Sequence, residues 1–290
     1  MVTFSLLLNA VVSGVLLGGF YAAVTIGITI AFGMLDIVNI AHPAFIVMGS
    51  FVAYLVNRMF GVDPLVTVFA VAPLFFLLGV CVFRFYYVVF ERSGKGSLRG
   101  LAFFFGMLFV MEVTLLLVFG VDYRLVQTSY IGPNIGFGSI DLPLRMVIPF
   151  IGSLALVSLL HLFFSRTFAG RAVMAVAQDE FALSLMAVDT AAIRQMAFGI
   201  AIATAAIAGG FLIVIQPVDP SLGREYIGRV FAICVLGGMR SITGTLIAAL
   251  ILGVLETISA TLFGPSWAPA IAFAALLLTL AVKPSGIMGR

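Results

Sequence analysis

Long apolar runs separated by short polar segments dominate the chain. The clearest runs cover residues 5–32, 41–56, 65–90, 98–119, 146–164 and 193–215. A bilayer core needs roughly 20 apolar residues for each helix that crosses it, and backbone groups in lipid must find their hydrogen bonds within the protein. The shorter alternating segments of a membrane β-barrel are absent from the sequence. The pattern therefore predicts an all-α fold, a polytopic bundle of transmembrane helices.

The pattern is less regular in the last third of the chain. The apolar stretch 229–262 is too long for one span and too short for two, and it is interrupted at Gly237, Gly238 and Arg240. Because non-helical backbone is tolerated at membrane depth where protein or water surrounds it, we expect a broken or re-entrant pair here. A final span over 268–282 then ends in the cytoplasm, whereas one tilted span over 229–262 would leave the C-terminus outside. The prediction is a single domain, 1–290, with about eight membrane segments.

Composition and charge support a membrane protein and orient it. Hydrophobic residues make up 63% of the chain and charged residues 9%, against about 25% charged in soluble domains. Cations cluster at two loops between spans: Arg84, Arg92, Lys95 and Arg99 at one, and Arg166, Arg171 and Arg194 at the other. Such clusters mark cytoplasmic loops, so both loops are expected inside and the N-terminus outside. The net charge of +3 is then explained by topology, with no nucleic-acid partner expected.

The segment 166–190, between two spans, is expected to form a short, weakly amphipathic helix at the cytoplasmic membrane surface. Met174, Ala177, Phe181 and Leu185 recur at three- and four-residue steps, so one helix is expected to present them on one face, with Asp179 on the far side. Such a face can lie in a groove of a partner protein. It can equally rest on lipid headgroups, and periodicity alone does not choose between the two.

Two carboxylates fall inside predicted membrane segments. Glu112 lies in the fourth span and Glu256 in the interrupted region. Ionisable groups in a bilayer are costly, usually face the bundle interior or water, and are candidates for a solute or proton pathway. The alternative is a packing role, with each carboxyl hydrogen-bonded to a neighbouring helix. Both interpretations remain open from the sequence.

Asn39 and His42 stand at the turn between the first two spans. Asn39 could cap the second helix, with Pro43 at an early helical position. The two histidines are far apart and lack a nearby carboxylate or cysteine cluster, so we expect no metal site. Cys81 and Cys234 are expected to be small buried apolar residues. No arrangement of nucleophile, base and orienting group indicates a catalytic site, which makes a membrane enzyme a weak hypothesis.

The segment Ser93-Gly94-Lys95-Gly96-Ser97 resembles a phosphate-binding loop only superficially. A P-loop needs Ser or Thr directly after Gly-Lys, and Gly96 occupies that position. We therefore interpret the segment as a basic cytoplasmic turn. Any energy from ATP would have to come through another polypeptide.

Taken in order, several short motifs resemble the inner-membrane permease family of ATP-binding-cassette (ABC) importers for branched-chain amino acids. They are Tyr21-Ala22, Gly27-Ile28-Thr29, Phe32-Gly33, Asn39-Ile40-Ala41-His42, Gly170-Arg171-Ala172, Ala177-Gln178-Asp179, Gly237-Gly238 with Ser241 and Gly244, and Pro284 with Gly286. The similarity covers nearly the whole chain. Three positions depart from the family pattern: Pro43, Ala187 and Arg240 each replace a common glycine. These departures leave the identity of the substrate undecided, but they do not count against the family.

The resemblance implies that 166–190 is a cytoplasmic coupling helix that docks on an ATPase. Its coupling residues would be Gly170, Arg171, Met174, Ala177, Gln178, Asp179, Phe181, Leu185 and Asp189. From these motifs, and from the carboxylates inside the predicted spans, we expect the substrate pathway to include Asn39, His42, Glu112, Gly237, Gly238, Arg240 and Glu256. Glycine pairs allow close backbone approach, and helix N-termini at such breaks can meet a carboxylate; simple tight packing at Gly237 and Gly238 is the alternative.

The family resemblance also implies partners and a location. They are a second, similar permease, two cytoplasmic ATPase subunits that hold ATP and Mg²⁺, and an extracytoplasmic solute-binding protein, in the cytoplasmic membrane of a bacterium or archaeon. The chain itself would hold no cofactor. The rival hypothesis is an ion-coupled secondary transporter that uses Glu112 and Glu256.

Overall fold

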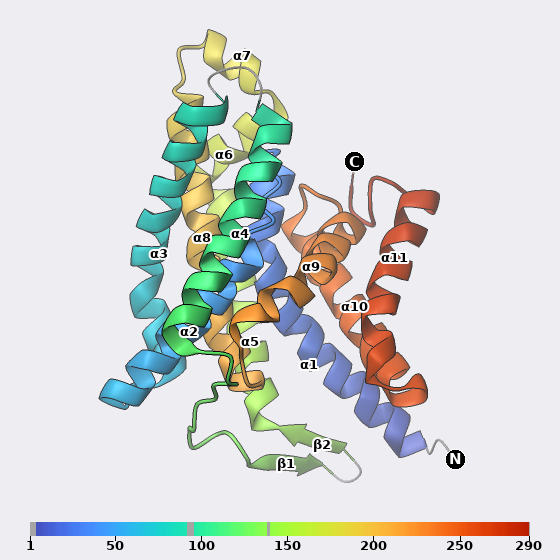
Figure 1. Ribbon diagram of the computed structural model, residues 1–290. Helices are drawn as coiled ribbons and strands as arrows, with labels where there is room; N and C mark the ends of the chain where they lie inside the picture. The colour runs from blue at the N-terminus through green and yellow to red at the C-terminus, as the bar shows by residue number, and fades with distance from the viewer. Residues whose placement is uncertain (1–3, 92–95, 138–139, 290) are drawn as a thin grey trace.

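The computed structural model describes residues 4–91, 96–137 and 140–289. Figure 1 shows a bundle of long helices with a small β-hairpin at one end. Arg92 and Lys95 of the predicted basic loop, and most of the P-loop-like segment, lie outside the described residues. The elements, in chain order, are α1 (Phe4–Ile28), η1 (Thr29–Met34), α2 (His42–Phe60), α3 (Pro64–Tyr86), η2 (Tyr87–Glu91), α4 (Gly96–Phe119), β1 (Asn134–Phe137), β2 (Ile140–Pro143), α5 (Leu144–Arg166), α6 (Phe168–Gln178), α7 (Glu180–Leu185), α8 (Thr190–Ile215), η3 (Pro220–Leu222), α9 (Gly223–Gly237), α10 (Ile242–Phe263), η4 (Pro265–Trp267) and α11 (Ala268–Val282).

The helical bundle is confirmed. Eight helical segments in the described part of the chain are long and apolar enough to cross a membrane. They are built on α1, α2, α3, α4, α5, α8, α10 and α11. The interrupted region is a broken pair, as predicted: the 15-residue α9 is too short to span a bilayer, and the 22-residue α10 is long enough.

The two ends of the bundle differ in character. The start of α1 and the β-hairpin lie at one end in Figure 1, and α6, α7 and the C-terminal segment lie at the other. The second end holds Arg84, Arg166 and Arg171, so the positive-inside rule assigns it to the cytoplasm. The C-terminal segment lies at the same end as α6 and α7 (Figure 1), which agrees with a broken pair rather than one tilted span.

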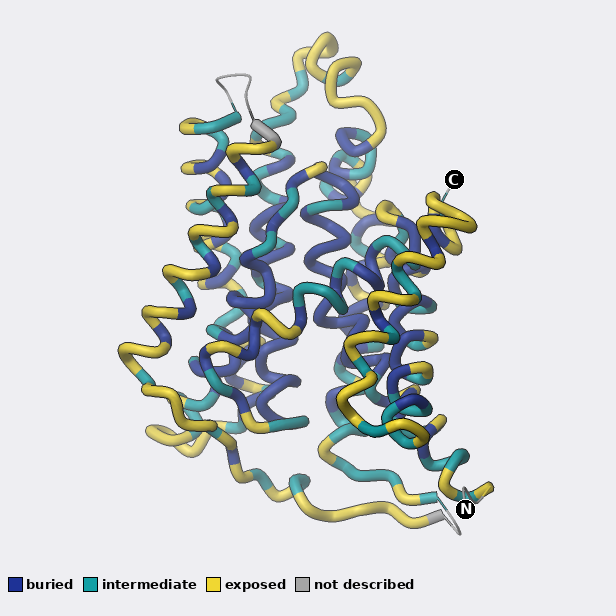
Figure 2. The backbone as a smooth tube through the Cα atoms, turned by 45° about the vertical axis from the view of Figure 1, so that its right-hand side comes forward, coloured by how far each residue is buried: buried dark blue, intermediate teal, exposed yellow. Residues whose placement is uncertain are grey.

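The core lies along α1 and α8, which are the most buried spans (Figure 2). Small residues allow the backbones to come together: a Cβ on Gly18 of α1 would stand 2.6 Å from the Leu250 Cα of α10. Close approach of this kind is how helices associate in lipid, where the hydrophobic effect does not drive them together. The spans α3, α4 and α11 expose much of their apolar surface. Cys234 is buried as expected, but Cys81 on α3 is exposed, so that prediction is wrong for Cys81.

The outer loop 122–143 is more ordered than its composition suggests. It contains the hairpin β1–β2, in which Asn134 pairs with Pro143 and Phe137 with Ile140. Four-residue strands are too short to give a period-two pattern, which explains why the sequence did not predict them. The Tyr130 hydroxyl ties the loop to the α2–α3 turn by donating to Asp63 Oδ2 at 2.8 Å. Burial and this hydrogen bond raise the pKa of Tyr130 above its usual value.

Candidate functional site

The cytoplasmic segment 166–190 forms two helices rather than one. Asp179 adopts an extended conformation, with φ −154° and ψ 94°, and separates α6 from α7. Its Oδ1 accepts a hydrogen bond from the Ala182 amide at 2.9 Å and so caps α7. Because the helix breaks there, the expectation that Met174, Ala177, Phe181 and Leu185 share one helix face is wrong.

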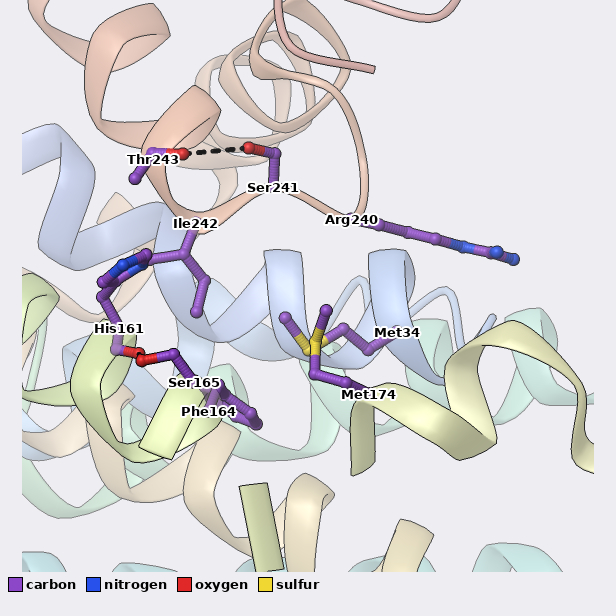
Figure 3. Close-up of a pocket in the computed structure, with 9 residues that line it drawn as sticks. All are labelled: Met34, His161, Phe164, Ser165, Met174, Arg240, Ser241, Ile242 and Thr243. Carbon is purple, nitrogen blue, oxygen red and sulfur yellow. Dashed lines mark hydrogen bonds between the residues drawn. The ribbon is translucent and has the colours of Figure 1, made fainter. Parts of the chain in front are cut away.

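Helix α6 packs on the bundle. A Cβ on Gly170 would lie 2.2 Å from the Phe163 carbonyl oxygen, so only glycine permits this contact with α5. Ala177 is buried. Met174 lies beside Met34 in a cavity of about 200 Å³ between α5, α6 and the α9–α10 turn (Figure 3). Arg171 and Gln178 are exposed.

Helix α7 carries two of the exposed apolar residues of the segment; a third, Phe168, begins α6 and is 84% exposed. Phe181 and Leu185 are 72% and 73% exposed and stand one helical turn apart. Met186, which follows the helix, is 74% exposed. Figure 2 shows this region as an exposed projection at the cytoplasmic end. Helix α7 therefore offers one apolar surface of the segment that a partner could contact.

A buried arginine links α7 to the bundle. Arg194, in the first turns of α8, is only 6% exposed. Its Nη1 donates to Glu91 Oε1, and to Glu180 Oε1 at 3.2 Å, while its Nη2 donates to the Leu35 carbonyl oxygen at 3.3 Å. Asp189 caps the same helix through the Ala192 amide at 3.0 Å. The sequence indicated Arg194 as one of several surface cations, and its buried ion pairs were not predicted.

Helix α9 is held in the membrane by two ion pairs. Arg224 pairs with Glu112 on α4, and the Arg229 Nε donates to Glu256 Oε1 on α10 at 3.2 Å. Glu256 also accepts from the Tyr21 hydroxyl of α1 at 2.6 Å. Arg224 and Arg229 were missed as site residues. The sequence did contain a signal for them. Arginines next to an apolar stretch need carboxylate partners, and the predicted spans held two carboxylates, Glu112 and Glu256, with no assigned partner.

These pairings change the interpretation of Glu112 and Glu256. Both carboxylates are buried, at 8% and 2% exposed, and each faces a guanidinium. Each ion pair joins α9 to a neighbouring helix, to α4 through Glu112 and to α10 through Glu256. The contacts therefore favour a structural role in fixing α9 over a relay.

The glycine pair Gly237-Gly238 lies at the cytoplasmic end of α9. Gly238 has φ +94°, which suits glycine, and a Cβ there would stand 2.6 Å from the Gly289 amide nitrogen. The Ile287 amide donates to the Leu236 carbonyl oxygen at 2.8 Å, so the C-terminal segment covers the turn. Arg240 is exposed, with its Nη2 4.0 Å from Asp36 Oδ2, and it is one of the residues that line the cavity beside Met34 and Met174 (Figure 3). These three residues lie near the cytoplasm, apart from the charged residues of α9.

Asn39 and His42 are fully buried. The α2 N-cap is Ala41, without a side-chain hydrogen bond, so the predicted capping role of Asn39 is wrong; Pro43 does stand in the first turn. A Cβ on Gly27 would lie 2.2 Å from His42 Cε1, which shows how closely the ring packs on α1. No group of three or more His, Cys, Asp or Glu residues in the described ranges could hold a metal ion.

Comparison with known proteins adds the family. Residues 10–280 match the model of a family described as "Branched-chain amino acid transport system / permease component". The high-affinity branched-chain amino acid transport system permease protein BraD of Pseudomonas aeruginosa is 28% identical over 98% of this chain and 96% of its own length. The corresponding LivH protein of Escherichia coli is 29% identical over the same shares. A probable LivH permease of Methanocaldococcus jannaschii is 25% identical over 91% of this chain and 87% of its own. No solved structure matches the chain significantly.

Proposed function

The chain belongs to the branched-chain amino acid permease family, and from this premise we propose that it is the permease subunit of an ATP-driven importer of branched-chain or other amino acids. It is a multi-pass protein of the cytoplasmic membrane, as predicted. The observation that carries the proposal is the family match over 10–280, nearly the full length of the chain. The relatives from Pseudomonas aeruginosa and Escherichia coli are permeases of branched-chain amino acid transport systems.

The ATPase partners are part of the proposal. The chain's P-loop-like segment has Gly96 where a phosphate-binding loop needs Ser or Thr. We therefore assign ATP and Mg²⁺ to two separate ATPase subunits on the cytoplasmic side. The exposed Phe181 and Leu185 on α7 support a docking contact there, because an apolar helix face that projects from a bundle fits a groove in a partner.

Two further partners complete the proposed importer. A second permease of the same family would cover part of the exposed bundle surface and complete the pathway. A solute-binding protein would deliver the solute from outside. A polar groove of about 640 Å³ beside the β-hairpin, lined by Asn134, Asp141 and Arg145 among others, offers a surface for that contact.

Copurification and uptake test the proposal. An affinity-tagged chain, expressed with its neighbouring genes and purified in mild detergent, should bring two ATPase subunits and a second permease, identified by mass spectrometry. Proteoliposomes that contain this complex should take up L-leucine only with ATP on the ATPase side and binding protein on the other. Uptake by the chain alone, driven by a proton or sodium gradient, would favour the ion-coupled rival.

A further inference from the structure

A cavity of about 380 Å³ lies between α9 and α11. Arg224, Glu225, Gly228 and Arg229 line it from α9, and Pro269, Ala272 and Phe273 line it from the start of α11. Glu112, the partner of Arg224, precedes the outer end of α4 at Phe119 by seven positions (119 minus 112). At 1.5 Å per residue this is about 10 Å. The cavity therefore lies in the outer half of the membrane, on the side from which a solute arrives.

The cavity places charge on an otherwise apolar surface. The Arg224 side chain is 53% exposed although its guanidinium pairs with Glu112. Glu225 is exposed, and within the described chain its carboxylate forms no hydrogen bond or salt bridge. On the flanking helices, Leu117 and Leu277 are exposed apolar residues. Charged groups are costly against lipid and normally face the bundle interior or water. The cavity is therefore expected to be wet in the assembled transporter.

The residues that line the cavity provide a cation, an anion and an apolar wall. Arginine has five N–H donors in a planar fork that suits a carboxylate, and Glu112 occupies only the Nη2 group of Arg224. The Glu225 carboxylate can accept from an ammonium group. The apolar wall comes from α11, and Gly228 lets it approach: a Cβ there would stand 2.5 Å from Phe273 Cζ.

We propose that this cavity is a subsite for a zwitterionic α-amino acid with an aliphatic side chain. Arg224 binds the carboxylate, Glu225 binds the ammonium group, and Phe273 packs against the side chain. A cation, an anion and an apolar wall within one small cavity match these three parts of the solute. The subsite rests on the proposed function and adds to it the place where the solute first meets charged groups of this chain.

Thiol protection tests the subsite in the assembled complex. Cys81 and Cys234 are replaced by alanine, and a cysteine is introduced as Pro269→Cys, at an exposed lining position. The matched control is Ser266→Cys, also exposed, three residues earlier and outside the cavity. A water-soluble maleimide is applied from the outer side of proteoliposomes, with L-leucine, 3-methylbutylamine or 4-methylpentanoate present. The two analogues lack the carboxylate and the ammonium group, respectively.

Leucine is expected to slow labelling at position 269 about sixfold at a concentration of about five times its Kd, because the free fraction falls as 1/(1 + [L]/Kd). Neither analogue should slow labelling of position 269 to this extent, and none of the three compounds should change the labelling rate at position 266. Adding Glu225→Gln should abolish the protection. Equal protection by all three compounds, protection that survives Glu225→Gln, or no labelling of position 269 from outside would each overturn the subsite.

The subsite and the proposed function can fail separately. If the complex without these substitutions imports leucine with ATP while position 269 is not protected, only the subsite is wrong. If the purified chain has no ATPase partners and shows no ATP-dependent uptake, the importer itself is wrong, whatever the labelling result.

Discussion

At the residue scale, the two ion pairs of α9 are not equivalent. Arg229 and Glu256 are both largely buried, with side chains 16% and 3% exposed. Arg224 is half-exposed, although its partner Glu112 is only 10% exposed. Removing one member of a buried pair leaves the other charge without a partner and costs about 3–5 kcal/mol, whereas exposed pairs contribute about 0–1 kcal/mol. Because water can reach Arg224, loss of its partner should be better tolerated.

We therefore expect Glu256→Gln to destabilise the protein more than Glu112→Gln. The first substitution strands the buried Arg229 and weakens the acceptor of the Tyr21 hydroxyl. The second leaves Arg224 accessible to water. Thermal unfolding of the two variants in the same detergent should give the lower midpoint for Glu256→Gln.

A double variant controls for the loss of charge. Glu256→Gln combined with Arg229→Gln removes both charges and should recover part of the lost stability, since no buried ion remains unpaired. If Glu256→Gln were as stable as the unsubstituted protein, the pair would not be what holds α9.

Sequence reasoning at this scale identified charges but not their partners. Glu112 and Glu256 stood out because carboxylates are rare in apolar runs, yet both pathway and packing roles remained possible. Arg224 and Arg229 lie 112 and 27 positions from their partners, and separations of that kind are set by the tertiary fold. The same limit explains the buried Arg194, whose partner Glu91 is 103 positions away.

At the element scale, the break at Asp179 separates a packed helix from a projecting one. Periodicity could not show it, because residues on both sides of Asp179 keep the three- and four-residue spacing of a single helix. The extended backbone of Asp179 ends α6, and the hydrogen bond that its side chain accepts from the Ala182 amide starts α7 as a separate helix. By contrast, the long spans were predictable, because membrane thickness fixes the length of each apolar run.

Asp179→Ala should loosen α7 while leaving α6 in place. Loss of an N-cap side chain costs roughly 1 kcal/mol, a large amount for a six-residue helix. Hydrogen exchange followed by mass spectrometry should show faster exchange over 180–186 and unchanged exchange over 168–178. Asp179→Asn keeps an acceptor and serves as the matched control. Equal exchange in all three proteins would show that the cap does not hold α7.

Phe181→Asp and Leu185→Asp should each weaken binding of the ATPase subunits. Both side chains are exposed, so a charge there is compatible with folding but not with an apolar groove. The control is Ala187→Asp, at an exposed position after α7 whose φ of +58° aspartate tolerates better than most residues. Copurified ATPase should fall for the first two variants and stay near its original level for the third. Full ATPase binding and uptake by Phe181→Asp would show that this face contacts lipid headgroups instead.

At the scale of the whole molecule, α9 decides on which side the chain ends. The chain descends through α8, returns toward the cytoplasm through residues 216–237, and descends again through α10 (Figure 1). The half-length α9 completes a crossing that hydropathy alone could not assign, because Arg224, Glu225 and Arg229 interrupt the apolar run. With that crossing, the outer N-terminal end and the inner C-terminal segment are consistent with the positions of the cations.

Single-cysteine labelling of intact cells tests this topology. After removal of Cys81 and Cys234, cysteines at Gln178 and Ser285 should be protected from an impermeant maleimide added outside, and a cysteine at Asp141 should react; all three positions are exposed. Lys95, outside the described residues, should be protected as well, because the basic loop is expected inside. Labelling of all the protected positions after cells are permeabilised controls for accessibility. Reaction at position 178 in intact cells would reverse the whole orientation. Reaction at position 285 alone would mean that residues 216–237 do not return the chain to the cytoplasmic side, so that α9 would not complete a crossing.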